Sequence, residues 1–401
     1  MIEVLRDGRW ANRDRLLPAA WMAIATYLII LVYLYGVSGQ VTTADNIIRS
    51  DFLSFWVAAR EALSGVPEIP YLIDRFSNIQ EAYLGEGQFF AFFYPPTFLF
   101  LILPLGAMSA MLAFVVFQVV SLSMSGFACS RITGNWHGFL VIAALPATFN
   151  SLFHGQSALL CAALLGGGLA AIAQQRMILA GVFIGLLTIK PQMGVLIPFA
   201  LLAGGYYRTF LSAAATTVLF ALISWIAFGT DTWSAFLDQT TFAREVMSKG
   251  QVEFYKMVSV FSAARLVGLP IAAAYLVQGL VGLGVLIVVC RVWHGKAPVE
   301  AKAIVLVAGG YLVTPFVLSY DLAALAVALS FAIRLTGGRQ TASWMWTLTA
   351  VALLVSICSR YFGEVTSIPI GWIAPAIFFW VGLVLSRQED TRPHPAALPA
   401  A

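Results

Sequence analysis

The sequence predicts an all-α protein that crosses a membrane many times. Its 401 residues are 60% hydrophobic and only 10% charged, whereas soluble domains carry about 25% charged residues. Apolar runs of about 17 to 22 residues recur along the chain, and each is long enough to cross a bilayer as a helix. Because runs such as PAAWMAIATYLIILVYLYGV lack the alternation of barrel strands, we expect a helical bundle.

Twelve apolar segments are predicted to be membrane spans. They lie near residues 18–37, 89–107, 109–130, 137–153, 157–174, 177–205, 209–228, 270–291, 299–313, 321–335, 341–358 and 369–386. The segment 177–205 carries IKPQM at its middle, so it is either a proline-kinked helix or a pair of short re-entrant helices. We expect one transmembrane domain over residues 1–386 and a disordered cytoplasmic tail over 387–401.

Basic residues predict the orientation of the chain. Four arginines precede the first span: Arg6, Arg9, Arg13 and Arg15. By the positive-inside rule both termini are then cytoplasmic, and the two large polar segments, 38–88 and 229–269, lie outside. Within the first segment, DFLSFWVAAREALSG places its aromatic residues at helical spacing, which predicts an amphipathic helix on the membrane surface.

Several classes of function have no signal in the sequence. The formal net charge is only +4, and no Lys/Arg-rich run with interleaved aromatics suggests a nucleic-acid partner. No glycine-rich loop predicts a nucleotide site. The four cysteines, Cys129, Cys161, Cys290 and Cys358, lack metal-ligand spacing, so we interpret them as small core residues.

Polar residues interrupt the apolar sequence at five places, and each is a candidate functional site because charge in hydrocarbon costs several kcal/mol. The places are Asp51 in RSDFLSFWVAAR, Tyr94 in FFYPPTFLF, His154 and Gln156 in FNSLFHGQSALL, Lys190 and Gln192 in LLTIKPQMG, and Tyr320 and Asp321 in TPFVLSYDLAAL. Several carboxylates, a buried lysine and further arginines near the outer leaflet are the groups that a lipid phosphate with a polar head requires.

Each place also has a purely structural interpretation. Tyr94, followed by two prolines, is equally expected as an interfacial anchor at a helix start. His154 and Gln156 would otherwise bond the carbonyls freed around Gly155.

The charged residues have structural alternatives as well. Lys190 would snorkel to the interface or pair with a structural acid, and Asp321 and Asp51 would cap the helices that follow them. Three further charges, Arg60, Asp74 and Arg75, are expected to be solvated.

The order of these motifs resembles glycosyltransferase family 87, which includes mycobacterial mannosyltransferases that use polyprenyl-phosphate mannose. The matching motifs, over residues 45–335, are DFLSFWVA from Asp51, GVPEIPY, YPP with LPLGAMS, Gly-Gln, Lys-Pro and PFVLSYD ending at Asp321. The resemblance implies the GT-C fold, with juxtamembrane helices in the first outer loop and an active site at the outer face of a bacterial-type inner membrane.

The resemblance also implies a reaction. A mannose-like hexose would pass with inversion from a polyprenyl-phosphate carrier to a hydroxyl of a lipid or glycan acceptor, and Asp51 matches the family's general base. A hydroxyl needs such a base because it is a poor nucleophile at neutral pH. We expect neither a cofactor nor a metal, because no Asp-x-Asp pair lies near Asp51.

Further substrate-binding residues follow from this chemistry. Negative charge develops on the leaving phosphate, and Lys190, Arg265 and Arg244 are the predicted cations. The sugar or phosphate would also be contacted by Tyr94, His154, Gln156, Gln192, Tyr320 and Asp321. At the last motif the mycobacterial members carry histidines after a Ser-Trp, where this chain has Ser319-Tyr320-Asp321, so the role of Asp321 and the identity of the sugar stay open.

Two other functions are compatible with the sequence. In a transporter or flippase of a lipid-linked or anionic solute, Asp51, Lys190 and Asp321 would form a binding or coupling network. The absence of a pseudo-symmetric half argues against this alternative. A non-catalytic assembly or anchoring protein would leave Lys190 without a reason to be buried.

Overall fold

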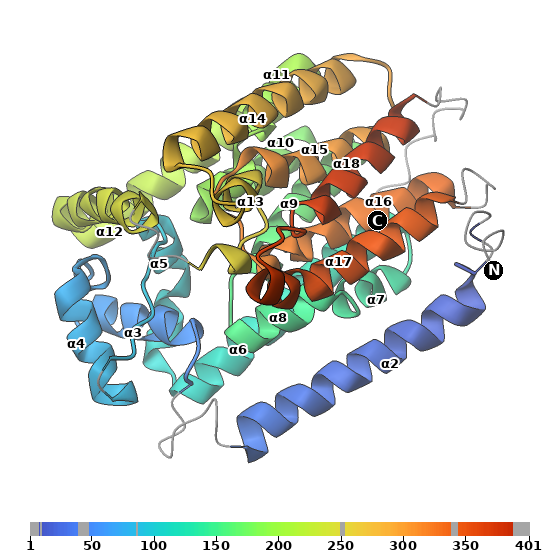
Figure 1. The fold of residues 1–401 in the computed structure, drawn as a ribbon. Coiled ribbons are helices and arrows are strands. Elements are labelled where there is room, and N and C mark those ends of the chain that lie inside the picture. Colours follow the sequence, from blue (N-terminus) through green and yellow to red (C-terminus); the bar gives the residue numbers. More distant parts are fainter. Residues whose placement is uncertain are drawn as a thin grey trace.

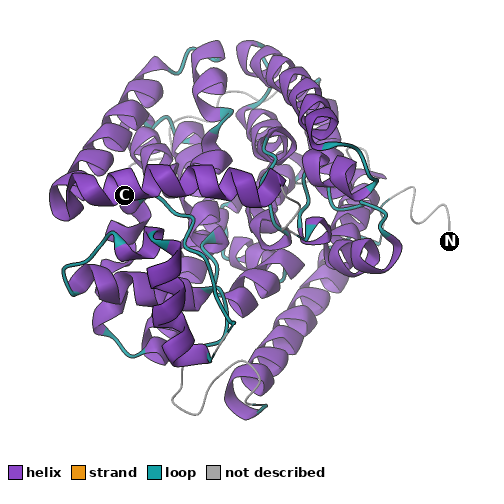
Figure 2. Cartoon of the chain, turned by 60° about the vertical axis from the view of Figure 1, so that its left-hand side comes forward, coloured by secondary structure: helices purple, strands orange, loops and turns teal. Residues whose placement is uncertain are grey.

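The chain folds into a bundle of helices (Figures 1 and 2). This computed structural model describes residues 8, 10–38, 48–85, 87–248, 253–337 and 344–387. Between two described residues, the one extended pairing is the isolated bridge of Met257 with Leu318. The all-α prediction is therefore confirmed. Helices satisfy their own backbone hydrogen bonds, which an apolar environment requires.

The helices follow one another in short steps along the chain. Their bounds are α2 Arg13–Val32, η1 Tyr33–Val37, α3 Phe52–Leu63, η2 Ile69–Tyr71, α4 Ile73–Leu84, α5 Pro96–Ile102, η3 Leu103–Ala107, α6 Ala110–Thr133, α7 His137–Ala143, α8 Pro146–His154, α9 Ala158–Ala173, α10 Met177–Leu186, η4 Leu187–Ile189, η5 Pro191–Gly194, α11 Ile197–Ala203, α12 Tyr207–Ser248, η6 Phe254–Lys256, α13 Val260–Leu266, α14 Ile271–His294, α15 Val299–Val313, η7 Ser319–Ala324, α16 Leu325–Thr336, α17 Trp344–Thr366 and α18 Ile373–Ser386.

Six helices of the described chain are long and apolar enough to cross a membrane, which makes this a multi-pass membrane protein. They are Arg13–Val37, Ala110–Thr133, Tyr207–Thr241, Ile271–His294, Ser319–Thr336 and Trp344–Thr366. Several of the twelve predicted spans are shorter than expected, because proline or glycine breaks the apolar run. The predicted span 137–153, for example, is divided into α7 and α8 just before Pro146.

The predicted span 89–107 does not cross the bundle. At its start, Gln80 of α4 bonds both the N–H and the carbonyl of Phe90. Just beyond its end, the indole of Trp56 in α3 donates to the carbonyl of Met108 at 3.0 Å. Because α3 and α4 pack together, both ends of this segment lie on the same side of the bundle. The prediction of a crossing is wrong here, since Pro96 and Pro104 limit the segment to one short helix and a 3₁₀ turn.

The segment 177–205 is a pair of short helices rather than one kinked helix. Thr209, at the start of α12, donates to the carbonyl of Met177 at 3.1 Å. The chain therefore enters the bundle at Met177 and has returned to the same depth by Thr209, six residues after α11 ends. Lys190 lies at the turn of the pair, with φ −141° and ψ 76°, just before Pro191. At 1.5 Å per residue, the 13 residues from Met177 to Ile189 carry Lys190 about 20 Å into the bundle.

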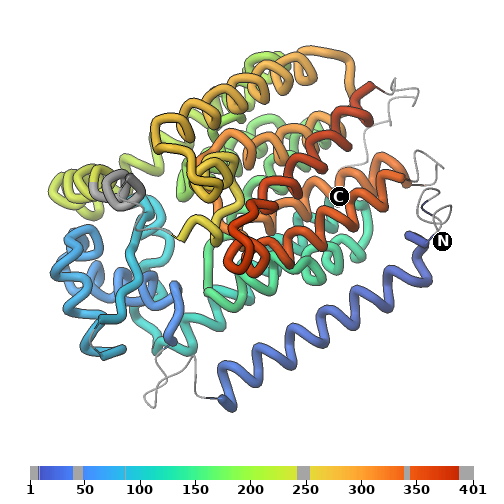
Figure 3. The backbone as a smooth tube through the Cα atoms, viewed as in Figure 1, coloured from blue at the N-terminus to red at the C-terminus, as the bar shows by residue number. Residues whose placement is uncertain are grey.

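The described part of the first loop, from Ile48 onward, is folded against the bundle (Figure 3, light blue). Residues Phe52 to Ala59 of α3 are all buried, so the prediction of a helix lying on the membrane surface is wrong. The aromatic side chains pack on protein: Phe55 meets Phe98 edge to face at 4.9 Å. From the second large segment, Gln239 of α12 donates to the carbonyl of Pro70 at 3.4 Å. The two large polar segments therefore meet at one end of the molecule, as the predicted topology requires. The predicted tail 387–401 lies, after its first residue, outside the described residues.

Candidate functional site

Asp51 precedes α3 but does not cap it. Its side chain accepts no hydrogen bond from the first turn of the helix, so the capping interpretation is wrong. Instead, Oδ2 accepts a hydrogen bond from the side-chain amide of Gln156 at 2.8 Å. The hydroxyl of Ser54 donates to the main-chain carbonyl of Asp51 at 2.7 Å and fixes the start of the helix. The carboxylate is thus held by a contact across the fold and not by its own helix.

Gly155 makes the contact between Gln156 and Asp51 possible. It ends α8 in the left-handed region, with φ +68°, which an L side chain enters only at a cost. A Cβ atom at this position would lie 2.4 Å from Cβ of Phe52, the residue next to Asp51. Only glycine therefore allows the turn between α8 and α9 to approach α3 so closely.

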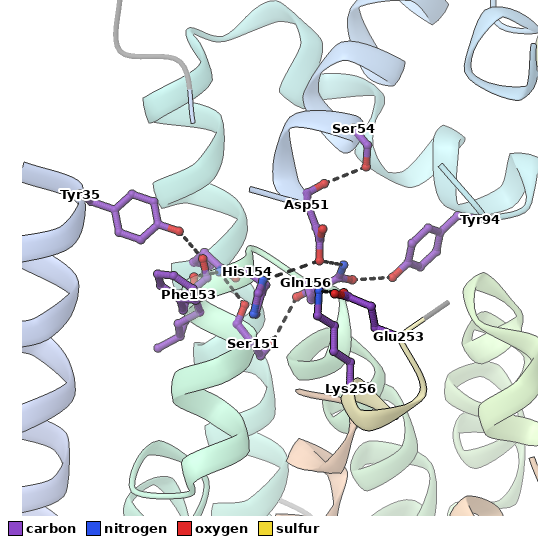
Figure 4. Close-up of polar contacts among 12 residues, drawn as sticks. Tyr35, Asp51, Ser54, Tyr94, Ser151, Phe153, His154, Gln156, Glu253 and Lys256 are labelled. Carbon is purple, nitrogen blue, oxygen red and sulfur yellow. Dashed lines mark hydrogen bonds and ion pairs between the residues drawn. The ribbon is translucent and has the colours of Figure 1, made fainter. Parts of the chain in front are cut away.

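A directed chain of hydrogen bonds ends at Asp51 (Figure 4). Tyr94 donates to the amide oxygen of Gln156 at 2.9 Å, and its own oxygen lies 2.8 Å from the hydroxyl of Ser157. An ionised carboxylate only accepts, so the amide nitrogen of Gln156 faces Asp51 and its oxygen faces Tyr94. Ser157 must then donate to Tyr94. Every donor in this chain points toward the carboxylate.

Asp51 and His154 form the accessible part of this cluster. His154 Nδ1 lies 3.8 Å from Asp51 Oδ2, and the two side chains are 26% and 31% exposed. Asp51 Oδ1 accepts no hydrogen bond from the described residues. This oxygen is therefore available to take a proton from a hydroxyl that reaches it.

A buried ion pair lies deeper in the bundle. Lys190 Nζ bonds Asp321 Oδ1, and both side chains are buried. Asp321 Oδ2 accepts from the N–H of Leu318 at 3.2 Å, so this carboxylate organises its own turn from inside η7 and does not cap the following helix α16, whose start has no side-chain cap. The pair leaves Lys190 with little net charge to offer a ligand.

Tyr320 and Tyr94 connect the ion pair to Asp51. The Lys190 ammonium lies 5.4 Å from the ring of Tyr320 and 5.8 Å from that of Tyr94. The ring of Tyr320 is in turn 5.9 Å from that of His154. Four of the polar places found in the sequence, and Lys190 from the fifth, therefore form one continuous cluster.

Two cations near His154 were not among the predicted site residues. Lys256, from η6, and Arg360, from α17, both lie within electrostatic range of His154. Lys256 is paired with Glu253 and points toward Gln156 and Asp51 (Figure 4). Hydrogen bonds from Lys256 and Tyr255 lower the pKa of the Glu253 carboxyl. Lys256 can bind an anion at this end of the cluster if the anion displaces Glu253.

The loop that carries Lys256 is fixed to the loop before η7. Val258 N–H donates to the carbonyl of Val317 at 2.9 Å, beside the bridge between Met257 and Leu318. The second large polar segment and the last sequence motif thus reach the site together. No motif signalled this, because basic residues in a polar segment are ordinary.

Two of the predicted substrate-binding residues, Arg265 and Gln192, make no contact with the Asp51 cluster, and the side chain of a third is not described. Arg265 donates to the carbonyl of Leu269 at 2.7 Å and lies over the ring of Phe254. Because Phe254 begins η6, the turn that carries Lys256, this contact stabilises that turn. Gln192 lies in η5, and its side chain makes no hydrogen bond with the described residues. Arg244 belongs to α12, but its side chain lies outside the described part of the chain.

Among the described residues, no group of three or more His, Cys, Asp or Glu side chains is placed to hold a metal ion. The described site instead combines a carboxylate with one free oxygen, an imidazole and two cations. Such a set can deprotonate a hydroxyl and bind a phosphate.

Comparison with known proteins gives one match. The model of glycosyltransferase family 87 matches residues 92–315, which is more than half of the chain. The matched region contains Tyr94, His154, Gln156 and Lys190, and it ends just before Tyr320. Comparisons with curated proteins and with solved structures gave no match.

Proposed function

Because the chain belongs to glycosyltransferase family 87, we propose that it is a membrane enzyme that moves a sugar from a polyprenyl-phosphate carrier to a hydroxyl acceptor. Asp51 is the general base of this reaction. The observation that carries the proposal is the carboxylate itself: Oδ2 is fixed by Gln156, and Oδ1 is left free of described partners in an accessible side chain. The acceptor is a lipid or glycan, and the sugar is a mannose-like hexose.

The proposed reaction is a single displacement with inversion. As the acceptor oxygen forms its bond to C1 of the sugar, its proton passes to Asp51 Oδ1, and the bond from C1 to the phosphate oxygen breaks. The polyprenyl phosphate leaves with the electron pair of that bond. A positioned carboxylate contributes roughly 100- to 10,000-fold to such a step. His154, next to the same carboxylate, is placed to bond the sugar or the acceptor.

Charge on the leaving phosphate needs nearby cations, and Lys256 and Arg360 are better suited than Lys190. Lys190 is neutralised by Asp321, whereas Lys256 has a partner on an exposed loop that a phosphate can displace. We therefore reassign Lys190, together with Asp321, from phosphate binding to holding Tyr94 and Tyr320 in place. Arg265 supports Lys256 through Phe254.

The distribution of arginines supports an outward-facing site. At the end of the bundle opposite Asp51, Arg13 Nη2 meets His137 Nε2 at 3.2 Å and Arg334 donates to the carbonyl of Ile132. The same end carries Arg131 and Arg176. Because clusters of arginine stay in the cytoplasm, Asp51 would face the outside, where a lipid-linked donor is available at the membrane surface.

The decisive experiment is sugar transfer by membranes that contain the Asp51→Asn variant. With a radiolabelled polyprenyl-phosphate sugar as donor, the variant should lose roughly 100-fold or more of the wild-type rate. Asp74→Asn is the matched control, since Asp74 is exposed on α4 in the same polar segment. Equal transfer by Asp51→Asn and wild type would remove Asp51 as the base. A wild-type protein that transports such a donor without any transfer would favour the transporter.

A further inference from the structure

A cavity opens between three helices at the end of the bundle away from Asp51. Its volume is about 270 Å³, and its lining is mostly apolar. Both α6 and α10 pack on α9, and the cavity lies between them. The lining residues are Met124, Phe127, Ala128, Arg131, Ala163, Gly167, Ala170, Ala171, Gln174, Arg176, Leu179 and Phe183.

Small side chains form the floor of the cavity, and large ones form its open edges. Ala163 and Ala170 of α9 are almost completely buried beneath it. Phe127 and Leu179, on the two facing helices, are 67% and 41% exposed. The cavity is therefore a groove that opens sideways, toward the hydrocarbon that surrounds a membrane helix.

Two arginines lie at the polar end of the groove. Arg131 is in the last turn of α6, and Arg176 directly precedes α10. Both are exposed, and neither side chain has a hydrogen-bond or ion-pair partner among the described residues. The lining contains no acidic residue. The groove therefore offers two unpaired guanidinium groups next to an apolar channel.

The groove is remote from the catalytic cluster. The helix α9 begins at Ala158, beside Gln156 and Ser157, and ends at Ala173, beside the arginines. Its 16 residues make it about 24 Å long. A ligand at the arginines therefore does not contact Asp51.

We propose that this groove binds an anionic phospholipid of the leaflet opposite the active site. One acyl chain lies over the alanine floor, and the phosphate bonds Arg131 and Arg176, whose planar forks suit phosphate oxygens. A cavity of about 150 Å³ already binds benzene, so this groove has room for a length of acyl chain. In a bilayer, a groove that opens sideways faces the acyl chains of the lipids. The side chains that line an empty groove would lose dispersion contacts, which a bound acyl chain supplies.

The experiment uses the full chain in detergent with two added lipids that share the same acyl chains. Phosphatidylglycerol should raise the unfolding temperature saturably and by more than phosphatidylcholine does. Native mass spectrometry should show a bound phosphatidylglycerol. In the double variant Arg131→Gln/Arg176→Gln the apparent affinity for phosphatidylglycerol should fall by roughly tenfold or more, because two charge-assisted contacts are lost.

Two further variants keep the test specific. Arg208→Gln removes an exposed arginine at the same end of the bundle but outside the groove, and it should respond like wild type. Ala163→Leu fills the floor and should weaken binding while the arginines remain. The proposal is overturned if the double variant binds phosphatidylglycerol as wild type does, if both lipids act equally on wild type, or if inorganic phosphate reproduces the shift.

Discussion

Gln156 donates its side-chain amide to Asp51 at 2.8 Å, across 105 residues of sequence. This bond orients the carboxylate, and Tyr94 in turn fixes the amide. In Gln156→Leu the carboxylate of Asp51 remains but loses the bond that orients it. A hydrogen bond to a charged group contributes about 1.5–3 kcal/mol, so we expect kcat to fall by roughly 10- to 100-fold.

Sugar transfer measured over a range of donor concentrations checks this prediction. The matched control is Gln192→Leu, because Gln192 makes no side-chain hydrogen bond with the described residues. If Gln156→Leu changed only the donor KM and left kcat intact, the amide would be a binding group and not an orienting one.

Lys256 and Glu253 give a pair of variants with opposite expected effects. Lys256→Gln removes a positive charge near Asp51 and should raise the donor KM. Glu253→Gln removes the carboxylate that occupies Lys256, and it should lower the donor KM because the ammonium no longer has to leave a charged partner. Each change should be several-fold, as expected for partly exposed charges. The two KM values, measured in the same membranes, decide the matter: a shift of both in the same direction would contradict the assignment.

Much of the candidate site could be predicted because a charge or amide in an apolar sequence is costly and therefore conspicuous. Asp51, Gln156 and Asp321 all stood out in this way, and the structure brings them into one cluster. Lys256 and Arg360 did not stand out, because a lysine in a polar segment and an arginine at a helix end are ordinary. Only the packing of α17 against both α8 and η6 brings them to His154.

The fold shows a similar limit. Hydrophobicity predicted the helices and the class, but it does not reveal whether an apolar segment crosses the bundle or turns back. The turn at 89–107 depends on the bonds of Gln80 and Trp56 to residues at its two ends, and these bonds are made by side chains from another segment. The same limit applies to α3, whose aromatic face was equally suited to a membrane surface and to a protein interior.

The ion pair of Lys190 and Asp321 can be tested for a structural role. Asp321→Asn leaves the buried ammonium uncompensated, and removing one partner of such a pair costs about 3–5 kcal/mol. Replacing both, as Lys190→Met/Asp321→Asn, removes the uncompensated charge, so this double variant should be more stable than Asp321→Asn alone. Unfolding temperature in detergent measures the difference.

Sugar transfer by the same double variant then separates structure from chemistry. A folded double variant that keeps a substantial part of the wild-type kcat supports the structural role that we assign to the pair. A folded double variant without activity would return Lys190 to direct phosphate binding. Lys302→Met is a suitable control for the loss of a lysine from a helix of the bundle, because Lys302 has no ion-pair partner among the described residues.

Gly155 offers the last test, because two costs combine at this residue. Gly155→Ala places a side chain at φ +68° and within 2.4 Å of Phe52 Cβ. Gly65 has φ +89°, and a Cβ atom added there would meet no other atom within 4 Å, so Gly65→Ala carries the conformational cost alone, about 1–2 kcal/mol. The difference between the two variants isolates the clash with Phe52. We expect Gly155→Ala to be the less stable protein and, in the folded fraction, to lose sugar transfer, because the clash moves Gln156 away from Asp51. If the two variants had the same unfolding temperature and activity, the close approach at Gly155 would have no part in positioning the carboxylate.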